Sequence, residues 1–281
     1  MIGQEAGHLS ASRQRAAVML HTDTAYVQMA AGVTGNGVFQ IGAARRVLAA
    51  MKENGRGDAH TQEFERRWLA FAASMLTSHL LLERAEFLIR DALTLYPREA
   101  RLYLARGALM ETRLALTPLD PKFRTQPGRD RGAQAAAADY RHAIELDPML
   151  TMAYLRLGWL HVSTRDSRGR ESLERALAVA SDPIDRYLVH LFLGGIAERE
   201  QHFEIAEREY DVARAFCPAC QTPYVALTRV ETVLGKPARA QELAVAFAGL
   251  VDKTDDPWWN FHLGGFDQAT VAWLRGEARS Q

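Results

Sequence analysis

Features of a secreted disulfide scaffold, of an all-β fold and of a membrane protein are missing from this sequence. Two cysteines among 281 residues are too few for a disulfide framework. No run alternates Val, Ile or Thr with polar residues between tight turns, as strands do. No segment reaches roughly 18 consecutive apolar residues, the length of a membrane span, and the first 20 residues lack the apolar core of a signal peptide. We expect an all-α chain without a membrane span, either cytoplasmic or a fragment of an exported protein.

An excess of charge of one sign is also missing. Lys plus Arg and Asp plus Glu number 34 each, so the net charge is zero. Binding to nucleic acid or to an anionic membrane usually depends on a marked excess of positive charge. With 48% hydrophobic and 24% charged residues, the composition is that of a folded globular protein. These counts predict that the partner is not a nucleic acid and that binding is not driven by an anionic membrane surface.

Signatures of catalysis and of metal binding are missing as well. The sequence has no G-x-S-x-G, no P-loop and no paired carboxylates at catalytic spacing. Cys217-Pro218-Ala219-Cys220 is a C-x-x-C, but no second pair of ligands would complete a zinc site. Three interpretations of it stay open: a structural turn, a redox-active or disulfide-forming dithiol, and part of a metal site. We predict no catalytic residue, no metal and no cofactor.

A spacing of 34 residues organises what is present. Leu193 and Leu227 are 34 residues apart, and so are Ala206 and Ala240. Small residues at a helix crossing let two helices approach closely, and a proline ends a helix pair. One pair cannot bury its apolar face alone, so pairs must stack. The stretch 193–218 shows the whole pattern, with Gly194, Ala197, Ala206, Tyr210, Ala213 and Pro218 at its small, large and proline positions.

These positions resemble those of tetratricopeptide-repeat proteins, whose period is about 34 residues. The resemblance covers residues 62–250, with residues 11–52 as a weaker additional unit. It implies a right-handed superhelical solenoid of antiparallel helix pairs. We expect three parts: a degenerate helix pair and linker at 1–60, a repeat array at 61–250, and a capping segment at 251–281. His161 and His190 depart from the pattern, because the family prefers bulky aromatics there.

One repeat is longer than the others. Pro97 and Pro148 are 51 residues apart, an excess of 17 over the period. The excess corresponds to residues 117–133, where three prolines and two glycines disfavour a helix. We predict an extended loop inserted between the two helices of this repeat, either a functional loop or a tolerated surface insertion.

The tail is rich in tryptophan, with three of the five tryptophans of the chain between residues 258 and 273. It resembles the closing segments of some bacterial repeat proteins. A stack of repeats ends in a helix whose apolar face needs a cover. We predict that residues 256–278 form a helix that caps the fifth pair, which starts near Tyr224. The alternative is that Trp258 and Trp259 are a docking motif for another chain.

The resemblance also implies a binding site, because the first helices of such repeats line a concave groove that commonly holds a partner peptide. Leu104, Leu155 and Leu191 occupy one of the lysine positions that clamp a carboxylate in chaperone-type repeats, so we do not expect a chaperone-tail receptor. The predicted function is a protein–protein interaction scaffold. The alternatives are that the groove residues pack against a neighbouring helix or the tail, that the C-x-x-C makes a redox or enzyme-associated protein, and that the chain is a self-associating structural unit; the oligomeric state stays open. The predicted groove residues are Arg101, Leu104, Glu111, Met152, Leu155, Trp159, Leu188, Leu191, Arg199 and Arg229.

Overall fold

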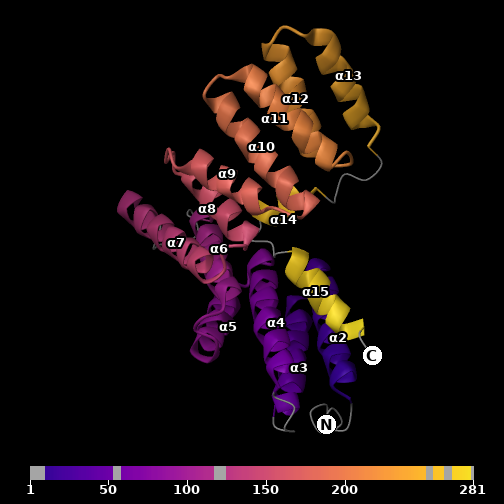
Figure 1. Ribbon diagram of the computed structural model, residues 1–281. Helices are drawn as coiled ribbons and strands as arrows, with labels where there is room; N and C mark the ends of the chain where they lie inside the picture. The colour runs from indigo at the N-terminus through magenta and orange to yellow at the C-terminus, as the bar shows by residue number, and fades with distance from the viewer. Residues whose placement is uncertain (1–9, 53–57, 117–124, 251–255, 263–267, 280–281) are drawn as a thin grey trace. The chain divides into compact units, whose positions relative to one another are not determined.

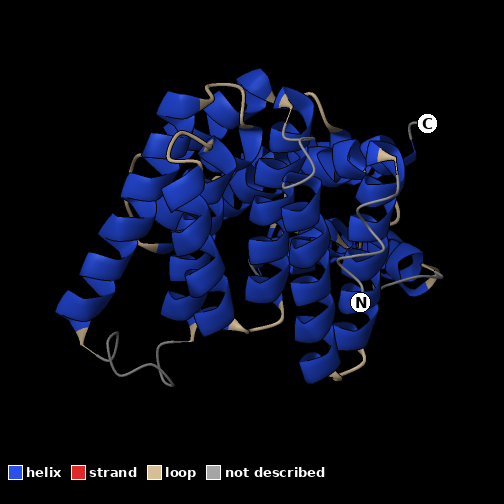
Figure 2. Ribbon diagram, turned by 90° about the horizontal axis from the view of Figure 1, so that it is seen from below, coloured by secondary structure: helices blue, strands red, loops and turns tan. Residues whose placement is uncertain are grey.

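The computed structural model describes residues 10–52, 58–116, 125–250, 256–262 and 268–279 (Figure 1). Within these ranges the regular elements are helices, and no strand occurs (Figure 2). The prediction of an all-α chain is therefore confirmed. None of the described helices combines the length and the apolar character that crossing a membrane requires.

The chain divides into two compact units. The first unit comprises Met1–Leu109 and Leu263–Gln281, and the second comprises Met110–His262. The helices are, in order, α2 (Ala11–Ala30), α3 (Thr34–Met51), α4 (Ala59–Ser78), α5 (Leu82–Leu95), α6 (Ala100–Ala115), α7 (Gln126–Leu146), α8 (Thr151–Ser163), α9 (Gly169–Val179), α10 (Pro183–Arg199), α11 (Phe203–Phe216), α12 (Gln221–Val233), α13 (Pro237–Ala248), α14 (Pro257–His262) and α15 (Gln268–Arg279).

The first unit is built from the helix pairs α2–α3 and α4–α5, with α15 packed against α2 and α4 (Figure 1). Its centre is Trp68, which is fully buried and donates its indole N–H to Thr22 Oγ1 at 2.8 Å, joining α4 to α2. Phe64, Met51 and Leu274 belong to the same buried apolar cluster. The last helix of the chain is therefore part of the core of the first unit.

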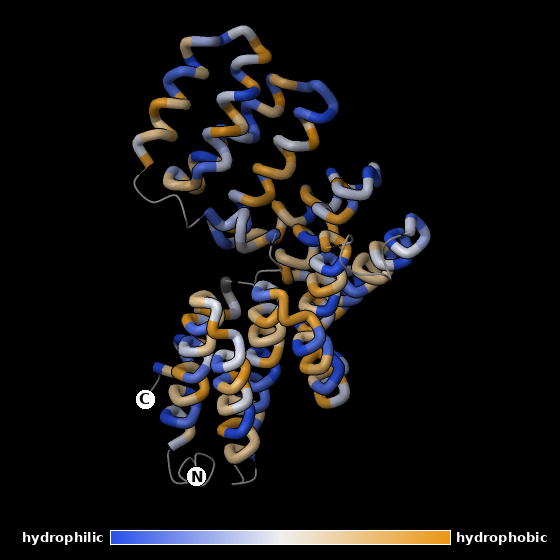
Figure 3. The backbone as a smooth tube through the Cα atoms, turned by 180° about the vertical axis from the view of Figure 1, so that it is seen from behind, coloured by the Kyte–Doolittle hydropathy of each residue, from blue (hydrophilic) through white to orange (hydrophobic). Residues whose placement is uncertain are grey.

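The second unit stacks the helix pairs α8–α9, α10–α11 and α12–α13. Hydrophobic and hydrophilic stretches alternate along the helices (Figure 3), as they do in amphipathic helices that share a core. Gly194 on α10 faces the ring of Tyr210 on α11 so closely that an added Cβ would lie 2.5 Å from it. Gly158 on α8 faces Leu173 on α9 in the same way, at 2.8 Å. The small residues of the repeat pattern are thus the places where paired helices meet.

The inserted loop predicted at 117–133 is shorter than expected. Residues 117–124 lie outside the described part of the chain, but α7 already begins at Gln126. The hydroxyl of Thr125 accepts the backbone N–H of Gly128 at 3.2 Å and caps the helix. Pro127 lies in the first turn, where its missing N–H has no intrahelical acceptor to lose. The proline that argued against a helix is therefore at the one place where a helix tolerates it.

The single capping helix predicted at 256–278 is wrong. The tail forms two helices, α14 and α15, which belong to different units. In the second unit α14 packs against α10, and Asp256 hydrogen-bonds to Thr222 on α12, the first helix of the fifth pair. In the first unit α15 packs against α2 and α4. The division at Leu109 also differs from the three parts expected from the sequence.

The contact between Gly194 and Tyr210 gives a test of the helix crossing. We expect Gly194→Ala to lower the free energy of unfolding by about 1–3 kcal/mol, because the new methyl group overpacks the crossing. Gly195→Ala is the matched control, since its Cβ would lie 3.8 Å from the nearest atom outside its own helix. Replacing a helical glycine by alanine without a clash stabilises by up to about 1 kcal/mol. Urea unfolding followed by circular dichroism measures both, and equal effects would contradict the close crossing.

The place of α15 in the first unit gives a second test. Leu274 is 0% exposed, so Leu274→Ala should cost about 2–5 kcal/mol, as other large-to-small core changes do. Leu20→Ala makes the same chemical change at a residue that is 68% exposed and should stay within about 0.5 kcal/mol of wild type. Guanidinium unfolding of the full chain gives both values. A Leu274→Ala protein as stable as the Leu20→Ala protein would mean that α15 is not part of this core.

Candidate functional site

The second unit has a face formed by side chains of α8, α10 and α12, here called the first-helix face, and α14 lies against it. It holds a cavity of about 630 Å³. Rings form part of its wall: Trp159 and Phe192 lie with their centroids 4.9 Å apart, and Trp258 of α14 also lines it. None of the described residues that line this cavity carries a carboxylate, whereas three are arginines, namely Arg165, Arg199 and Arg229.

The three arginines differ in the groups that they contact. Arg229 forms two hydrogen bonds with Glu198, which also accepts the Tyr210 hydroxyl. Arg199 donates to the carbonyl oxygen of Val162 at 2.8 Å. Among the described residues, neither Arg199 nor Arg165 forms an ion pair with a carboxylate. Within the described ranges, the cavity therefore has two arginines at its edge that form no ion pair with a carboxylate, in a chain of zero net charge.

Two carboxylates close to this edge are already engaged. Asp166 and Glu200 line an adjacent hollow together with Arg165 and Arg199. Asp166 binds Arg168 through several hydrogen bonds, and these hold the pKa of its carboxyl well below the usual range. Glu200 accepts from Arg170 at 2.7 Å. Asp166 and Glu200 therefore pair with Arg168 and Arg170 and not with the two arginines at the edge of the cavity.

At the start of α14, Asp256 is anchored to α10 and α12. Its carboxylate accepts the Tyr187 hydroxyl at 2.6 Å and, from Thr222, both the backbone N–H at 2.9 Å and the hydroxyl at 2.6 Å. Asp256 is only 3% exposed. Burial and the neighbouring carboxylate raise the pKa of Tyr187, which keeps this hydroxyl protonated and able to donate.

At the other end of α14, Phe261 is anchored by rings and by a cation. Its ring centroid lies 5.0 Å from that of Phe192 and 6.4 Å from that of Trp159. The guanidinium of Arg156 lies 4.2 Å from the ring centroid and donates to the Phe261 carbonyl oxygen at 2.8 Å. Phe261 is buried. The apolar and the polar part of this residue are both recognised by the first-helix face.

Arg156 is itself held by a buried acidic group. Its guanidinium lies 3.6 Å from Glu111 of α6, and the Tyr140 hydroxyl donates to the same carboxylate at 2.5 Å. Burial raises the pKa of Glu111, and the charge of Arg156 opposes that rise. Glu111 also lines a second cavity, of about 500 Å³, with Trp159 and His262. This cluster positions Arg156 against α14.

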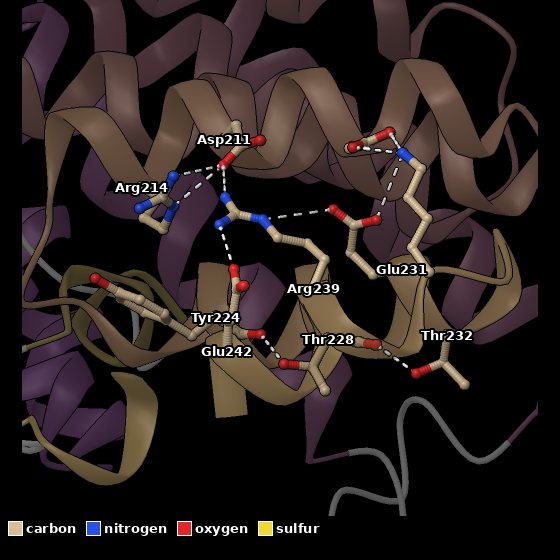
Figure 4. Close-up of polar contacts among 10 residues, drawn as sticks. Asp211, Arg214, Tyr224, Thr228, Glu231, Thr232, Arg239 and Glu242 are labelled. Atoms are coloured by element: carbon tan, nitrogen blue, oxygen red, sulfur yellow. Dashed lines mark hydrogen bonds and ion pairs between the residues drawn. The ribbon is translucent and has the colours of Figure 1, made fainter. Parts of the chain in front are cut away.

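Another concentration of charge lies on α11, α12 and α13, where acidic and basic side chains pair with one another (Figure 4). Arg239 is within 4.0 Å of Asp211, Glu231 and Glu242. Lys236 binds Glu207 and Glu231. Burial, followed by the nearby charge of Glu207, raises the pKa of Glu231. Because acidic and basic groups pair here, we interpret this network as a tie between the last helices and not as a binding site. The residues of this network come from α11, α12 and α13 and from Lys236, which directly precedes α13.

The C-x-x-C forms a disulfide bond between Cys217 and Cys220, across the turn from α11 to α12. Of the interpretations left open by the sequence, the redox-active or disulfide-forming dithiol is the one that includes this bond. Within the described ranges, no group of three or more His, Cys, Asp and Glu residues could hold a metal ion.

The ten predicted groove residues fall into three groups. Trp159, Leu191, Arg199 and Arg229 are brought together around the 630 Å³ cavity, and Glu111 and Trp159 line the second cavity. Arg101 and Leu104 lie in the first unit, where Arg101 donates to Thr270 of α15 at 2.9 Å. Met152, Leu155 and Leu188 are buried in the core, and Leu104 is also buried. The prediction that these four residues line an exposed groove is wrong, because the apolar first helices pack against their neighbours.

Several residues of this face were not found from the sequence. Arg165 has a left-handed backbone with φ of 59°, which nothing in its neighbourhood signals. Phe261 was assigned to a cap over the fifth pair, and Tyr187 was not singled out. Arg156 had a detectable signal, since it is a charged residue inside an otherwise apolar run from Leu155 to Leu160.

No protein-family model matches the chain, and no curated protein matches it. Similar solved structures include MamA, at 14% identity and a TM-score of 0.46 over 65% of this chain and 90% of MamA. TTC0263 of Thermus thermophilus, a tetratricopeptide-repeat protein, matches at 17% identity and a TM-score of 0.49 over 82% of this chain and all of that one. Human IFIT1, solved as a dimer with PPP-AAAA, matches at 15% identity and a TM-score of 0.48.

The match to IFIT1 covers 84% of this chain, which spans only 57% of the IFIT1 chain. Likenesses at this level carry nothing about function. The paired helices, with close crossings at the small residues of a 34-residue spacing, have the architecture of tetratricopeptide repeats. The described part of the chain therefore has a tetratricopeptide-repeat-like fold, as the sequence predicted. The expectation that it does not bind nucleic acid stays a prediction.

His262, at the end of α14, makes the attachment of this helix depend on pH. Burial, followed by the charge of Arg156, lowers the pKa of His262 from 6.5 to about 4. The unfolded chain then takes up a proton at a higher pH than the folded chain does. The stability of the folded state is therefore full above pH 6.5 and falls as the pH drops towards 4.

We expect the wild-type chain to lose about 1–2 kcal/mol more than a His262→Gln variant between pH 7 and pH 4.5, because His262 is only partly buried. Urea unfolding at a series of pH values measures this difference. Parallel curves for the two proteins would contradict the buried, neutral imidazole.

Proposed function

We propose that the chain is a protein-interaction module that binds a segment of a partner protein on the first-helix face of the second unit. The single observation that carries the proposal is the 630 Å³ cavity, whose described lining includes aromatic rings and three arginines and no carboxylate. Aromatic side chains and arginine are the residue types that contribute most to binding energy at protein interfaces.

Exposure at the cavity supports the same proposal. Val225 on α12 lines it and is 49% exposed, and Arg229 also stands exposed. A partner segment could therefore reach apolar and cationic groups without rearrangement of the core. Of the predicted groove residues, Trp159, Leu191, Arg199 and Arg229 are the ones we retain for this site.

Two other functions were considered on the sequence. A redox protein would use Cys217 and Cys220, of which Cys217 is half-buried and Cys220 is buried, so attack by another thiol is limited at the Cys220 sulfur. A self-associating structural unit would need an exposed apolar surface that matches itself, and the arginines at the cavity repel their own copies. We therefore favour a binding protein over an enzyme and over a self-assembling unit.

A photo-crosslinking experiment tests the site. Benzoylphenylalanine at position 225 should capture the partner on irradiation in cells that produce the protein, because that position lines the cavity. Position 212 on α11 is the matched control, since Val212 is also a partly exposed valine, at 38%, and does not line the cavity.

The products are then digested separately with protease and with nuclease. A product that depends on position 225 and is destroyed by protease supports the proposal. Equal capture from both positions, no capture from either, or a nuclease-sensitive product would contradict it.

A further inference from the structure

We infer that α14 occupies the place of a partner segment, and that the partner carries the same two anchors: a carboxylate and, five residues later, an aromatic ring. This inference rests on the proposed function and names the chemistry of the partner. The partner then competes with α14 for the first-helix face.

The first anchor is the carboxylate of Asp256. A carboxylate buried to this degree needs compensation for its lost water, and here three donors from two helices supply it: the Tyr187 hydroxyl and the N–H and hydroxyl of Thr222. Hydrogen bonds to an ionised acceptor are the stronger kind. These donors belong to α10 and α12 and would bind the acidic side chain of any segment laid in the same place.

The second anchor is the aromatic ring of Phe261. Its receptor consists of the rings of Trp159 and Phe192 and the guanidinium of Arg156. A cation over an aromatic face and tilted ring contacts each favour an aromatic side chain over an aliphatic one of the same size. The same guanidinium also donates to the carbonyl oxygen of Phe261, which fixes the direction of the backbone.

Between the anchors, α14 is too short to be stable as an isolated helix. It is a helix of six residues, and helices shorter than about 12 residues are marginal in water. Trp258 is half-buried and lines the cavity, whereas Trp259 is 49% exposed. An amphipathic helix laid into a groove is a common way of recognising a peptide. The covalent connection distinguishes α14 from such a peptide.

Charge complementarity argues for an acidic partner beyond the carboxylate anchor. The cavity next to α14 presents Arg165 and Arg199 without a carboxylate partner among the described residues. α14 itself has no acidic residue within Pro257–His262 and leaves these charges unused. A partner with further Asp or Glu residues near its aromatic anchor can use them, and this gives it an advantage over α14.

The covalent connection gives α14 a high effective concentration at the face, in the millimolar range for short flexible connections. A free peptide with the same anchors should therefore bind poorly to the wild-type chain. It should bind well when the anchors of the chain's own α14 are removed and the receptor residues on α8, α10 and α12 are left intact.

The test uses a fluorescein-labelled peptide with the sequence of residues 256–262, and fluorescence anisotropy. We expect the full-length Asp256→Asn/Phe261→Ala variant to bind it at least about tenfold more tightly than the wild-type chain does. Adding Tyr187→Phe to this variant should weaken the binding, because one donor of the carboxylate receptor is lost. A peptide with the phenylalanine replaced by alanine should bind about tenfold or more weakly, whereas replacement of the second tryptophan, the equivalent of exposed Trp259, should change little.

Circular dichroism melts establish that the variants are folded. If the double variant has lost its cooperative melt, the single variant Asp256→Asn is used, and the same order of affinities is expected. The inference is overturned if a folded variant binds the peptide no better than the wild-type chain, or if it binds the alanine peptide equally well. Capture of a protein from position 225 in that case would leave the proposed function standing with a partner of different chemistry. If the variant does not bind the peptide and position 225 captures no protein, the proposed function is overturned as well.

Discussion

The first-helix face of the second unit depends on Phe261. This ring lies against Trp159 and Phe192, and its carbonyl oxygen accepts from the buried Arg156. Arg156 in turn is balanced by Glu111, which also accepts from Tyr140. A buried cation without its partner is costly; Glu111 supplies a carboxylate to Arg156, and the carbonyl oxygen of Phe261 on α14 supplies a second acceptor. The packing of the repeat helices and the attachment of α14 are therefore coupled through Arg156.

The same dependence connects stability to function. Side chains that recognise α14 are also the ones that a partner segment would use, and removal of α14 without a replacement leaves apolar rings and a buried guanidinium uncovered. Exposed apolar patches favour association. On the proposed function, a face that α14 covers until a partner segment displaces it avoids that risk, and Arg165 and Arg199, which form no ion pair with a carboxylate among the described residues, favour an acidic partner segment.

The sequence predicted the parts of the fold that depend on local spacing. Gly194 and Tyr210 lie at the crossing that the small and large positions of the repeat implied, and the helix pairs follow from the 34-residue period. The extent of the loop was overestimated, because Pro127 can open a helix as easily as it can end one, and composition does not distinguish the two positions. Spacing predicts contacts within a pair better than it predicts helix ends.

The site was predicted only in part, for a different reason. Whether Leu155 or Leu188 faces a groove or a neighbouring helix depends on how the pairs stack, and the repeat pattern does not fix this. The tail has no repeat, so the separate places of Phe261 and Leu274 could not be derived from periodicity. Phe261 and Leu274 of the tail are buried whereas Trp259 is 49% exposed, and the surfaces that bury the first two are formed by residues far away in sequence.

The carboxylate of Asp256 attaches α14 to the first-helix face. A double-mutant cycle between Tyr187→Phe and Asp256→Asn measures this attachment most directly, because the two changes remove the donor and the charge with little change in shape. The structure predicts a coupling free energy of about 1 kcal/mol or more from unfolding experiments, as expected for a hydrogen bond to a charged group. Effects that add to within about 0.3 kcal/mol would show that the two side chains do not meet, and would contradict the account.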